Sequence, residues 1–229
     1  MDVNKNSYTF IFATVMVVVV AAVLSFAATT LKPLQQENVR MEKMQNILSS
    51  IDINKTREES AEVYPTYITQ EIVLTDNQLI DGVEAFNVDM AKEVKKAPLE
   101  RNAPLYIAEK EGEKYFIIPL QGTGLWGPIW GYISLKSDLS IYGAVFDHAK
   151  ETPGLGAEIK TDVFASQFKG KEILDENGNL IGIDVRKGDA NDANEVDVEI
   201  MIQDCLQSYI AYLKDFKNSM GSLTPNEIK

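Results

Sequence analysis

Two short glycine-rich stretches contain the residue types that a binding site for a flat or anionic ligand needs. The first, 121–128, has the sequence QGTGLWGP, and the second, 150–156, has the sequence KETPGLG. Glycine lets the main chain approach a ligand closely, while Thr123 and Thr152 offer hydroxyls and Trp126 an aromatic wall. A pair of tight turns explains the same glycines, and neither stretch matches a dinucleotide or phosphate-loop fingerprint. The pattern alone leaves both interpretations open.

Groups for acid-base, nucleophilic or metal chemistry are scarce. His148 is the only histidine; a proton-relay role is conceivable, but no nucleophile motif surrounds it. The single cysteine, Cys205, excludes an internal disulfide and a cysteine-rich metal site, and one histidine disfavours a zinc site. Cys205 lies on an apolar helical stripe, so we interpret it as a small buried hydrophobe. We predict no catalytic residue and no metal ligand.

Runs of β-branched and aromatic residues predict an antiparallel sheet that holds the two stretches. Residues 115–120, 129–135 and 141–146 have the character of consecutive strands separated by turn residues. Residues 171–174 and 180–185 flank Asn177-Gly178, which favours a hairpin turn. We therefore expect a sheet of at least five strands.

Helical periodicity appears on both sides of these strands. Near the C-terminus, apolar residues at helical spacing predict one amphipathic helix over a sheet face: Val198, Ile202, Cys205, Leu206, Tyr209, Leu213 and Phe216. Nearer the N-terminus, Met44, Ile47, Leu48 and Ile51 share one face of a stalk or docking helix. Between them, 54–113 is punctuated by Pro65, Pro98 and Pro104, and we expect it to be peripheral to the core.

Residues 9–31 contain no charged side chain and are long enough, at about 1.5 Å per residue, to span a bilayer core of roughly 30 Å. The apolar run is long for a cleaved signal peptide and only Lys5 precedes it, so we predict an uncleaved anchor. Lys32, Arg40 and Lys43 follow it, which favours a cytoplasmic domain by the positive-inside rule without settling the side. The net charge of −12 disfavours nucleic acid or an anionic lipid surface as a partner.

The stretch Glu151–Gly156 (ETPGLG), the upstream Gly124-Leu125-Trp126, the anchor and the closing helix together resemble the C subunit (NqrC) of the bacterial sodium-translocating NADH:quinone oxidoreductases. The ETPGLG stretch is shared with the G subunit of the related Rnf electron-transport complex. The Gly-Leu-Trp stretch and the long middle region favour the sodium pump.

The resemblance implies an α+β protein: one transmembrane helix, then an FMN-binding domain with an antiparallel sheet packed by helices. It implies a domain on the periplasmic side of the bacterial inner membrane that relays electrons through covalently bound FMN. Its implied partners are the other membrane subunits of the complex, a flavin transferase during maturation, and membrane lipid. It does not imply that the protein is catalytic alone.

The resemblance also suggests which residues hold the flavin. The ring would lie against Gly124, Leu125 and Trp126 and against Gly154, Leu155 and Gly156. Glu151 and Thr152 would bind its polar edge, and Lys187 would offset phosphate charge. We divide the chain into a tail and anchor (1–31), a juxtamembrane helix (32–53), a peripheral α/β region (54–113), an FMN-binding-like core (114–217) and a C-terminal tail (218–229).

The sequence departs from this family at the flavin attachment motif. The family esterifies the flavin phosphate to a threonine in the pattern Asp-x-x-Ser/Thr-Gly-Ala-Thr, whereas here Asp197 is followed directly by the helical residues Val198–Met201. The acceptor threonine expected between Asp197 and Val198 is absent. Because a strand or loop entering a helix needs capping and turning residues, we expect about ten residues to be missing from the sequence at this point. A true deletion would leave a flavin-free structural subunit, and a tethered solute-binding domain is a further alternative.

Overall fold

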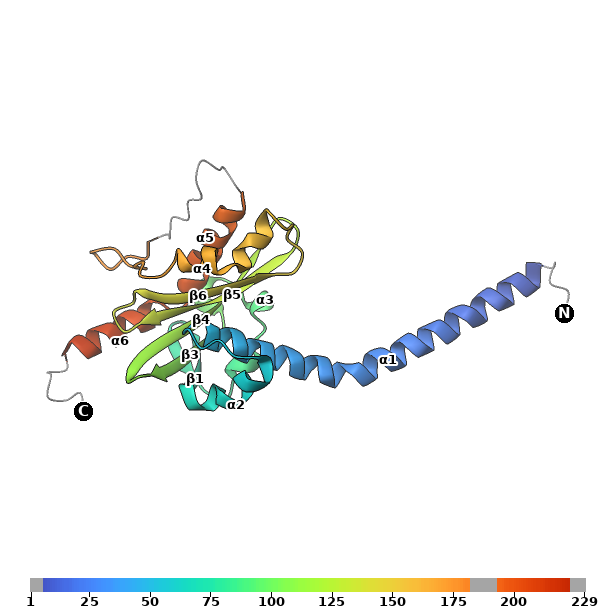
Figure 1. Ribbon diagram of the computed structural model, residues 1–229, viewed down its shortest axis with the longest axis horizontal. Coiled ribbons are helices and arrows are strands. Elements are labelled where there is room, and N and C mark those ends of the chain that lie inside the picture. Colours follow the sequence, from blue (N-terminus) through green and yellow to red (C-terminus); the bar gives the residue numbers. More distant parts are fainter. Residues whose placement is uncertain (1–5, 182–192, 223–229) are drawn as a thin grey trace. The chain divides into compact units, whose positions relative to one another are not determined.

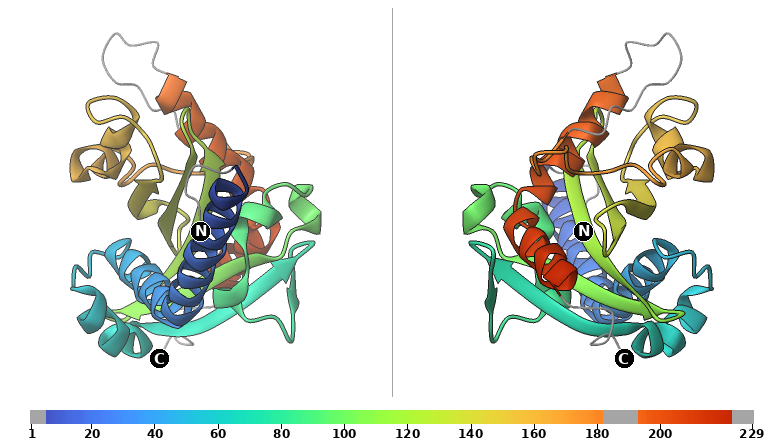
Figure 2. Two further views of the ribbon diagram at one scale, coloured as in Figure 1. Left: turned by 90° about the vertical axis from the view of Figure 1, so that its right-hand side faces the viewer. Right: turned by 90° about the vertical axis from the view of Figure 1, so that its left-hand side faces the viewer.

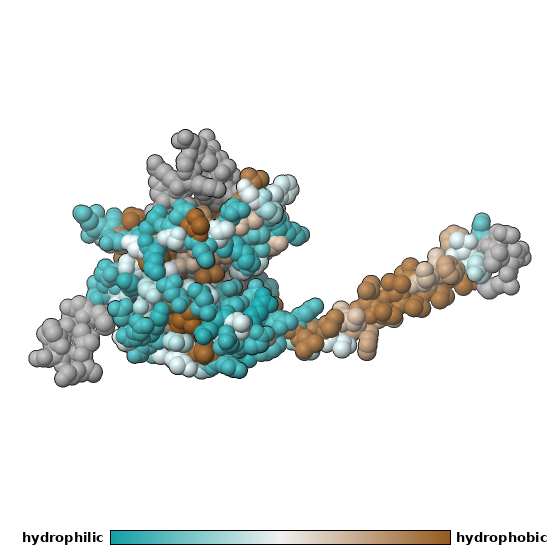
Figure 3. Space-filling view, viewed as in Figure 1, coloured by the Kyte–Doolittle hydropathy of each residue, from teal (hydrophilic) through white to brown (hydrophobic). Residues whose placement is uncertain are grey.

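The computed structural model describes residues 6–181 and 193–222. The chain forms two compact units, residues 1–42 and 43–229. Most of helix α1, Asn6–Ser49, makes up the first unit, and its apolar side chains are exposed along the brown stretch in Figure 3. Within the described ranges, α1 is the one helix whose length and composition suit a membrane span. The predicted apolar N-terminal helix is confirmed, and it continues through Pro33.

The second unit is built on one antiparallel sheet with the strand order β2-β1-β3-β4-β5-β6 (Figure 1). Three strands coincide with the predicted meander, which is confirmed. The strand bounds are Ile68–Thr75 (β1), Gln78–Ile80 (β2), Ala103–Lys110 (β3), Glu113–Thr123 (β4), Pro128–Lys136 (β5) and Ile141–His148 (β6). The short helices are η1 Ala85–Asn87, α3 Met90–Glu93, η2 Pro98–Glu100, η3 Gly156–Lys160 and α4 Asp162–Ser166.

The interpretation of 54–113 as peripheral is wrong. Strand β3 lies inside the sheet, paired with β1 on one side and β4 on the other. Its side chains from Ala103 to Ala108 are buried. Pro104, which suggested a break, is the second residue of the strand and pairs with Val73, so it lies where a missing N–H disturbs the ladder least.

The C-terminal helices cover one face of the sheet. Side chains alternate along β4, so Phe116, Ile118 and Leu120 face this layer and Ile117 faces the other. The layer contains α5, Ala193–Leu206, and α6, Ile210–Ser222, which Figure 2 shows on the side of the sheet opposite α2, Arg57–Tyr67.

The single closing helix that we predicted is two helices. Tyr209 lies between them, and its N–H donates to Leu206 O at 3.0 Å in a tight turn. The apolar spacing continues through this turn because Tyr209 is itself buried, with its hydroxyl on Pro104 O. The start was also misplaced, since α5 begins at Ala193, before Asp197.

The C-terminal end of α1 packs on the opposite sheet face. The predicted stripe of Met44, Ile47, Leu48 and Ile51 is buried there, so docking is the correct interpretation. Ser134 Oγ donates to Ser50 O at 2.5 Å, and Lys110 Nζ donates to Ile51 O at 2.8 Å. A side chain at Gly143 would overlap Ser50 O, so this approach is close.

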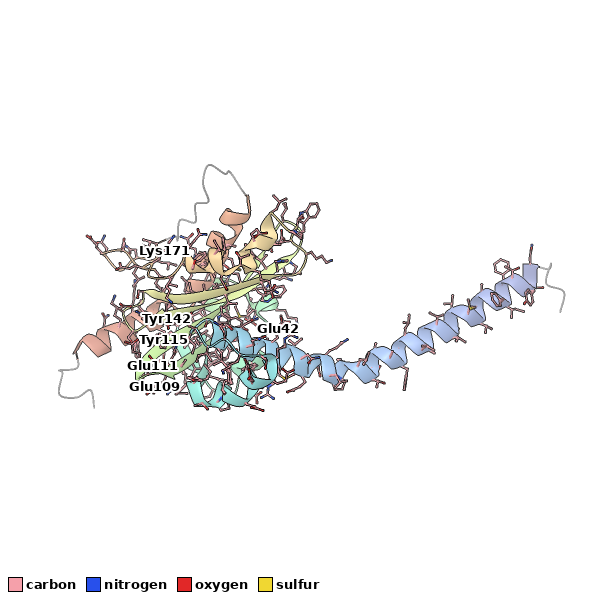
Figure 4. The ribbon with its side chains drawn as sticks, viewed as in Figure 1. Glu42, Glu109, Glu111, Tyr115, Tyr142 and Lys171 are labelled. Atoms are coloured by element: carbon pink, nitrogen blue, oxygen red, sulfur yellow. The ribbon has the colours of Figure 1, made fainter. Side chains whose placement is uncertain are left out.

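Aromatic and basic side chains surround the place where the C-terminal end of α1 packs on the sheet. The ring centroids of Tyr115 and Tyr142 lie 4.6 Å apart. Both residues are labelled in Figure 4. Lys169 Nζ is 4.9 Å from the Tyr142 ring and 2.9 Å from Asp52, directly after α1. Cation–π and ionic contacts therefore tie the end of α1 to β6 and to the segment after α4.

The predicted hairpin after residue 171 appears in its described part only as a turn with isolated bridges, and the described sheet reaches six strands through β1, β2 and β3 instead. Leu174 and Leu180 form an antiparallel bridge, and Gly178 closes the turn with φ of 78°. Residues 182–185 of the predicted second strand lie outside the described residues.

Candidate functional site

The first glycine-rich stretch is the turn of the β4–β5 hairpin. Gly124 N donates to Gly127 O at 2.7 Å, and Thr123 pairs with Pro128 at the base of the turn. On the β4 side, Gly122 lies so close to α5 that an added Cβ would meet Met201 Cβ at 2.9 Å. The absence of a side chain at Gly122 therefore lets α5 lie against the strand that leads into the turn.

The second stretch follows β6 and folds back on itself. The N–H groups of Leu155 and Ala157 both donate to Thr152 O, at 3.1 and 3.2 Å. Gly154 has φ of 79°, which glycine adopts without strain, and its N–H donates to Glu158 Oε1 at 3.0 Å. The turn interpretation is thus correct for the backbone of both stretches, and it leaves their binding role open.

Glu151 joins the two stretches. Its Oε1 accepts a hydrogen bond of 2.9 Å from the Trp126 N–H, and its own N–H donates to His148 Nδ1 at 3.2 Å. A Cβ at Gly124 would overlap Glu151 Oε1 and lie 2.8 Å from Ile129 Cγ2. Glycine is therefore required at position 124 because the carboxyl group occupies the adjoining space.

The Glu151 carboxyl group is buried and only half satisfied. The residue is 6% exposed, and Oε2 has no hydrogen-bond partner among the described residues. Buried polar atoms are nearly always paired, so the partner of this oxygen lies outside the described residues.

Three large apolar side chains project from the same two loops into solvent. Leu125, Trp126 and Leu155 are 62%, 63% and 61% exposed. Leu125 and Trp126 belong to the hairpin turn, and Leu155 to the loop that Glu151 begins. Large exposed apolar side chains beside a buried polar group are typical of a site that binds an amphipathic planar ligand.

The other predicted site positions fall in α5, at the start of η3, at an exposed loop position and outside the described residues. Lys187 lies outside the described residues. The backbone of Asp197 and Val198 is helical within α5, and Val198 is buried. Gly156 is buried at the start of η3, whereas Thr152 is exposed.

Sequence reasoning missed two contacts that shape the site. His148 receives the Glu151 N–H, so it orders the loop rather than standing apart from it. His148 and Glu151 are three residues apart at the end of a predicted strand, and this spacing could have indicated the contact from the sequence. Met201 against Gly122 joins residues far apart in the chain, and no local pattern indicates such a contact.

Cys205 does not contribute to the site. It is 2% exposed, and its thiol lies 3.7 Å from Gln121 O. Burial raises the pKa of the Cys205 thiol to about 11, which keeps it protonated and unreactive near neutral pH. The interpretation as a small buried hydrophobe is confirmed.

Comparisons with known proteins identify relatives of this chain. Residues 124–199 match the family model of the FMN-binding domain, which begins at Gly124. The chain is 28% identical over 207 residues to the C subunit of the Na(+)-translocating NADH-quinone reductase of Pseudomonas aeruginosa, covering 81% of this chain and 79% of that one. It is 28% identical to the same protein of Vibrio campbellii over 204 residues, covering 79% of this chain and 78% of that one.

Solved structures extend the similarity to the fold. Shewanella oneidensis NqrC superposes with a TM-score of 0.59 at 20% identity, covering 80% of this chain and 98% of that one, which supports the fold alone. The C subunit of the reductase from Parabacteroides distasonis superposes with a TM-score of 0.72 at 34% identity, covering 80% of this chain and 96% of that chain. With that identity over nearly all of a solved relative, this chain belongs to the NqrC family, the C subunits of the Na(+)-translocating NADH-quinone reductases.

Proposed function

We propose that this chain is the electron-transfer subunit of a membrane NADH:quinone oxidoreductase that couples electron flow to Na⁺ translocation, and that FMN bound at the two loops carries the electrons. The observation that carries the proposal is the hydrogen bond between Trp126 and Glu151. It unites both glycine-rich stretches at the point where the match to the FMN-binding domain begins.

The residues present fit the isoalloxazine ring of FMN. The ring is flat and apolar at one end and carries polar groups at the other. Leu125, Trp126 and Leu155 offer exposed apolar surface, and Glu151 offers an unpaired buried oxygen. Bound FMN would supply the redox chemistry, while these side chains would hold the ring and exclude water from it. Gly154 and Thr152 are proposed to border the same site.

The mode of attachment is the finer part of the proposal. We propose a phosphoester to a threonine carried by a segment between Asp197 and Val198, with Lys187 offsetting phosphate charge and a flavin transferase forming the bond. The present sequence runs directly from Asp197 to Val198, within the helix α5. We propose this bond for a chain that carries such a segment; a chain of the present sequence has no threonine at this point and would hold FMN at the two loops without it.

The proposed location is the bacterial inner membrane, with α1 as the anchor and the sheet domain on the periplasmic side. Its proposed partners are the other membrane subunits of the complex. The apolar helix supports the anchoring, whereas the basic residues Lys32, Arg40 and Lys43 oppose the periplasmic side. Protease treatment of spheroplasts distinguishes the sides, because only a periplasmic domain is digested without lysis.

The test of the proposed function is absorbance and peptide mass spectrometry of the purified full chain. We expect a flavin spectrum, and a flavin-modified peptide spanning Asp197 and Val198 establishes the covalent form. A flavin spectrum with an unmodified Val196-Asp197-Val198-Glu199 peptide supports noncovalent binding. A colourless protein that binds no added FMN would contradict the proposal and favour the flavin-free structural subunit.

A further inference from the structure

His148 is the last residue of β6 and the only histidine of the chain. Its Nδ1 accepts the Glu151 N–H at 3.2 Å, and the Glu151 carboxyl group in turn accepts the Trp126 N–H at 2.9 Å. A further bond of the loop after β6, from the Gly154 N–H to Glu158 Oε1, stays within the loop and η3. His148 and Trp126 therefore hold Glu151 from β6 and from the β4–β5 turn.

The bond between His148 and the Glu151 N–H exists in only one charge state of the imidazole. A ring nitrogen accepts a hydrogen bond through its lone pair, so Nδ1 is unprotonated here and the neutral ring carries its proton on Nε2. The imidazolium carries a proton on both nitrogens, and its Nδ1–H would face the Glu151 N–H as a second donor. Histidine is the side-chain type whose charge ordinarily changes between about pH 5 and pH 8. Protonation of His148 therefore replaces a hydrogen bond by two opposed donors.

The elements that pack against β6 carry further charges. η3 and α4 contact β6, whereas β5 places the uncharged Ile129 opposite His148 and carries Lys136 at its other end. The Asp147 carboxylate accepts the His148 N–H at 2.8 Å and pairs with Lys160 at 2.9 Å. The ionisable side chains of η3, α4 and the loop, together with Asp147, are Asp147, Lys150, Glu151, Glu158, Lys160 and Asp162. Acidic groups outnumber basic ones in this set, so an imidazolium meets net attraction and is not excluded by positive charge.

We infer that His148 couples the order of the loop 149–156 to pH. In its neutral form the imidazole holds Glu151 in place, and with it the carboxyl group that reaches Trp126. Protonation removes the acceptor, frees the Glu151 N–H and loosens the join between the loop and the β4–β5 turn. The consequence for the flavin rests on the proposed function, because these are the loops to which we assign FMN. The change in the loop itself needs no bound flavin.

The test is hydrogen–deuterium exchange of the full chain in detergent, measured by mass spectrometry at about pH 5 and about pH 8. Exposure times are scaled to the intrinsic exchange rate at each pH, and the readout is the protection of the peptide 149–156. Because one hydrogen bond between uncharged groups contributes modestly, we expect protection in the wild-type chain to fall about three- to tenfold at the lower pH. The peptide Ala103–Lys110 of β3 is largely buried and has no histidine, so it should keep its protection.

Three variants make the test specific. In His148→Asn the amide Oδ1 takes the place of Nδ1 and accepts a hydrogen bond without titrating, so we expect high protection at both pH values. His148→Phe keeps a ring but has no acceptor, and we expect low protection at both. Asp162→Asn removes one exposed negative charge from α4 and should keep the wild-type pH dependence. Far-ultraviolet circular dichroism establishes that each variant folds.

Two results would overturn the role of His148. The first is equal protection of the wild-type loop at both pH values. The second is a drop that persists in folded His148→Asn, since another group would then titrate. If His148→Asn does not fold, His148→Phe decides, because a pH dependence that survives without the imidazole contradicts the inference. The proposed function is tested separately on the same sample: a colourless chain that binds no added FMN contradicts it and leaves the exchange result standing.

Discussion

The guanidinium of Arg101 lies 2.9 Å from the carboxylate of Asp204 and donates to the main-chain carbonyl of the same residue at 3.0 Å. It also donates to Val94 O and Lys96 O. One 5% exposed side chain thus ties the last turn of α5 to the segment before β3. The C-terminal end of α5 is fixed by this contact, and its middle by the approach of Met201 to Gly122.

Arg101→Ala is expected to lower the free energy of unfolding by about 3 kcal/mol, because three carbonyl oxygens and a carboxylate lose their donor. Asp204→Ala is expected to cost less, about 1 kcal/mol, since Asp204 is 39% exposed and the carbonyl contacts of Arg101 remain. Urea unfolding of the full chain, followed by tryptophan fluorescence, measures both. Equal losses would show that the ion pair, rather than the carbonyl contacts, dominates.

Gly122→Ala is expected to destabilise the fold by about 1–3 kcal/mol, because its Cβ overlaps Met201 and α5 must shift. Met201→Ala removes the Cγ and Sδ atoms that the new Cβ would meet but keeps the Met201 Cβ at 2.9 Å, so the double variant should recover only part of the loss. A thermodynamic cycle from thermal melts of the four proteins measures this coupling. Strictly additive effects would mean that the two residues do not constrain each other.

Ser134→Ala is expected to cost about 1–3 kcal/mol, since its buried hydroxyl lies between Ser50 O and Gly143 O where α1 meets the sheet. Ser140→Ala is the matched control. Its hydroxyl bonds Asp138 on the exposed surface, and its loss should stay within about 0.5 kcal/mol. Urea midpoints compare the two, and a Ser134 variant as stable as the control would contradict this account.

The buried thiol of Cys205 is expected to make the free energy of unfolding depend on pH in the alkaline range. Burial raises its pKa to about 11, so between pH 9 and pH 11 the unfolded chain releases a proton that the folded chain retains. This contribution to the free energy of unfolding is fully present below pH 9 and is lost as the pH rises through 11, by about 3 kcal/mol. Buried tyrosines make the free energy of unfolding fall with pH in the same direction. The measurement is therefore the difference in this pH dependence between the wild-type protein and Cys205→Ala. Identical slopes in the two proteins would refute it.

The strands with continuous apolar runs were predictable, because burial on both faces of a sheet requires apolar residues at consecutive positions. The long apolar helix was predictable for a similar reason, because a run of apolar residues of that length has a composition that is visible in the sequence. Strand β1 has no such run: its burial pattern at Ile68–Thr75 alternates irregularly, and a register shift follows Ile68. Its place in the sheet is set by pairing with β3, about thirty residues away, which propensity does not encode. The turn at Tyr209 was not predicted either, because the helical spacing of the apolar residues continues unchanged across it.

The site was predictable in its residue types and not in its geometry. Glycines at 124 and 154 indicated unusual backbone, yet the requirement at Gly124 comes from the carboxyl group of Glu151, which approaches from another loop. The unpaired Oε2 is a property of the assembled loops, and neither stretch alone contains it.

The burial of the last turns of α1 determines where this protein can be cut. A chain that begins at Asn54 lacks Met44, Ile47, Leu48 and Ile51, and exposes the sheet face that these side chains cover. Such a fragment should aggregate when expressed. A fragment that retains its native core must start at or before Lys43, because the last turns of the apolar helix α1 belong to the core of the second unit.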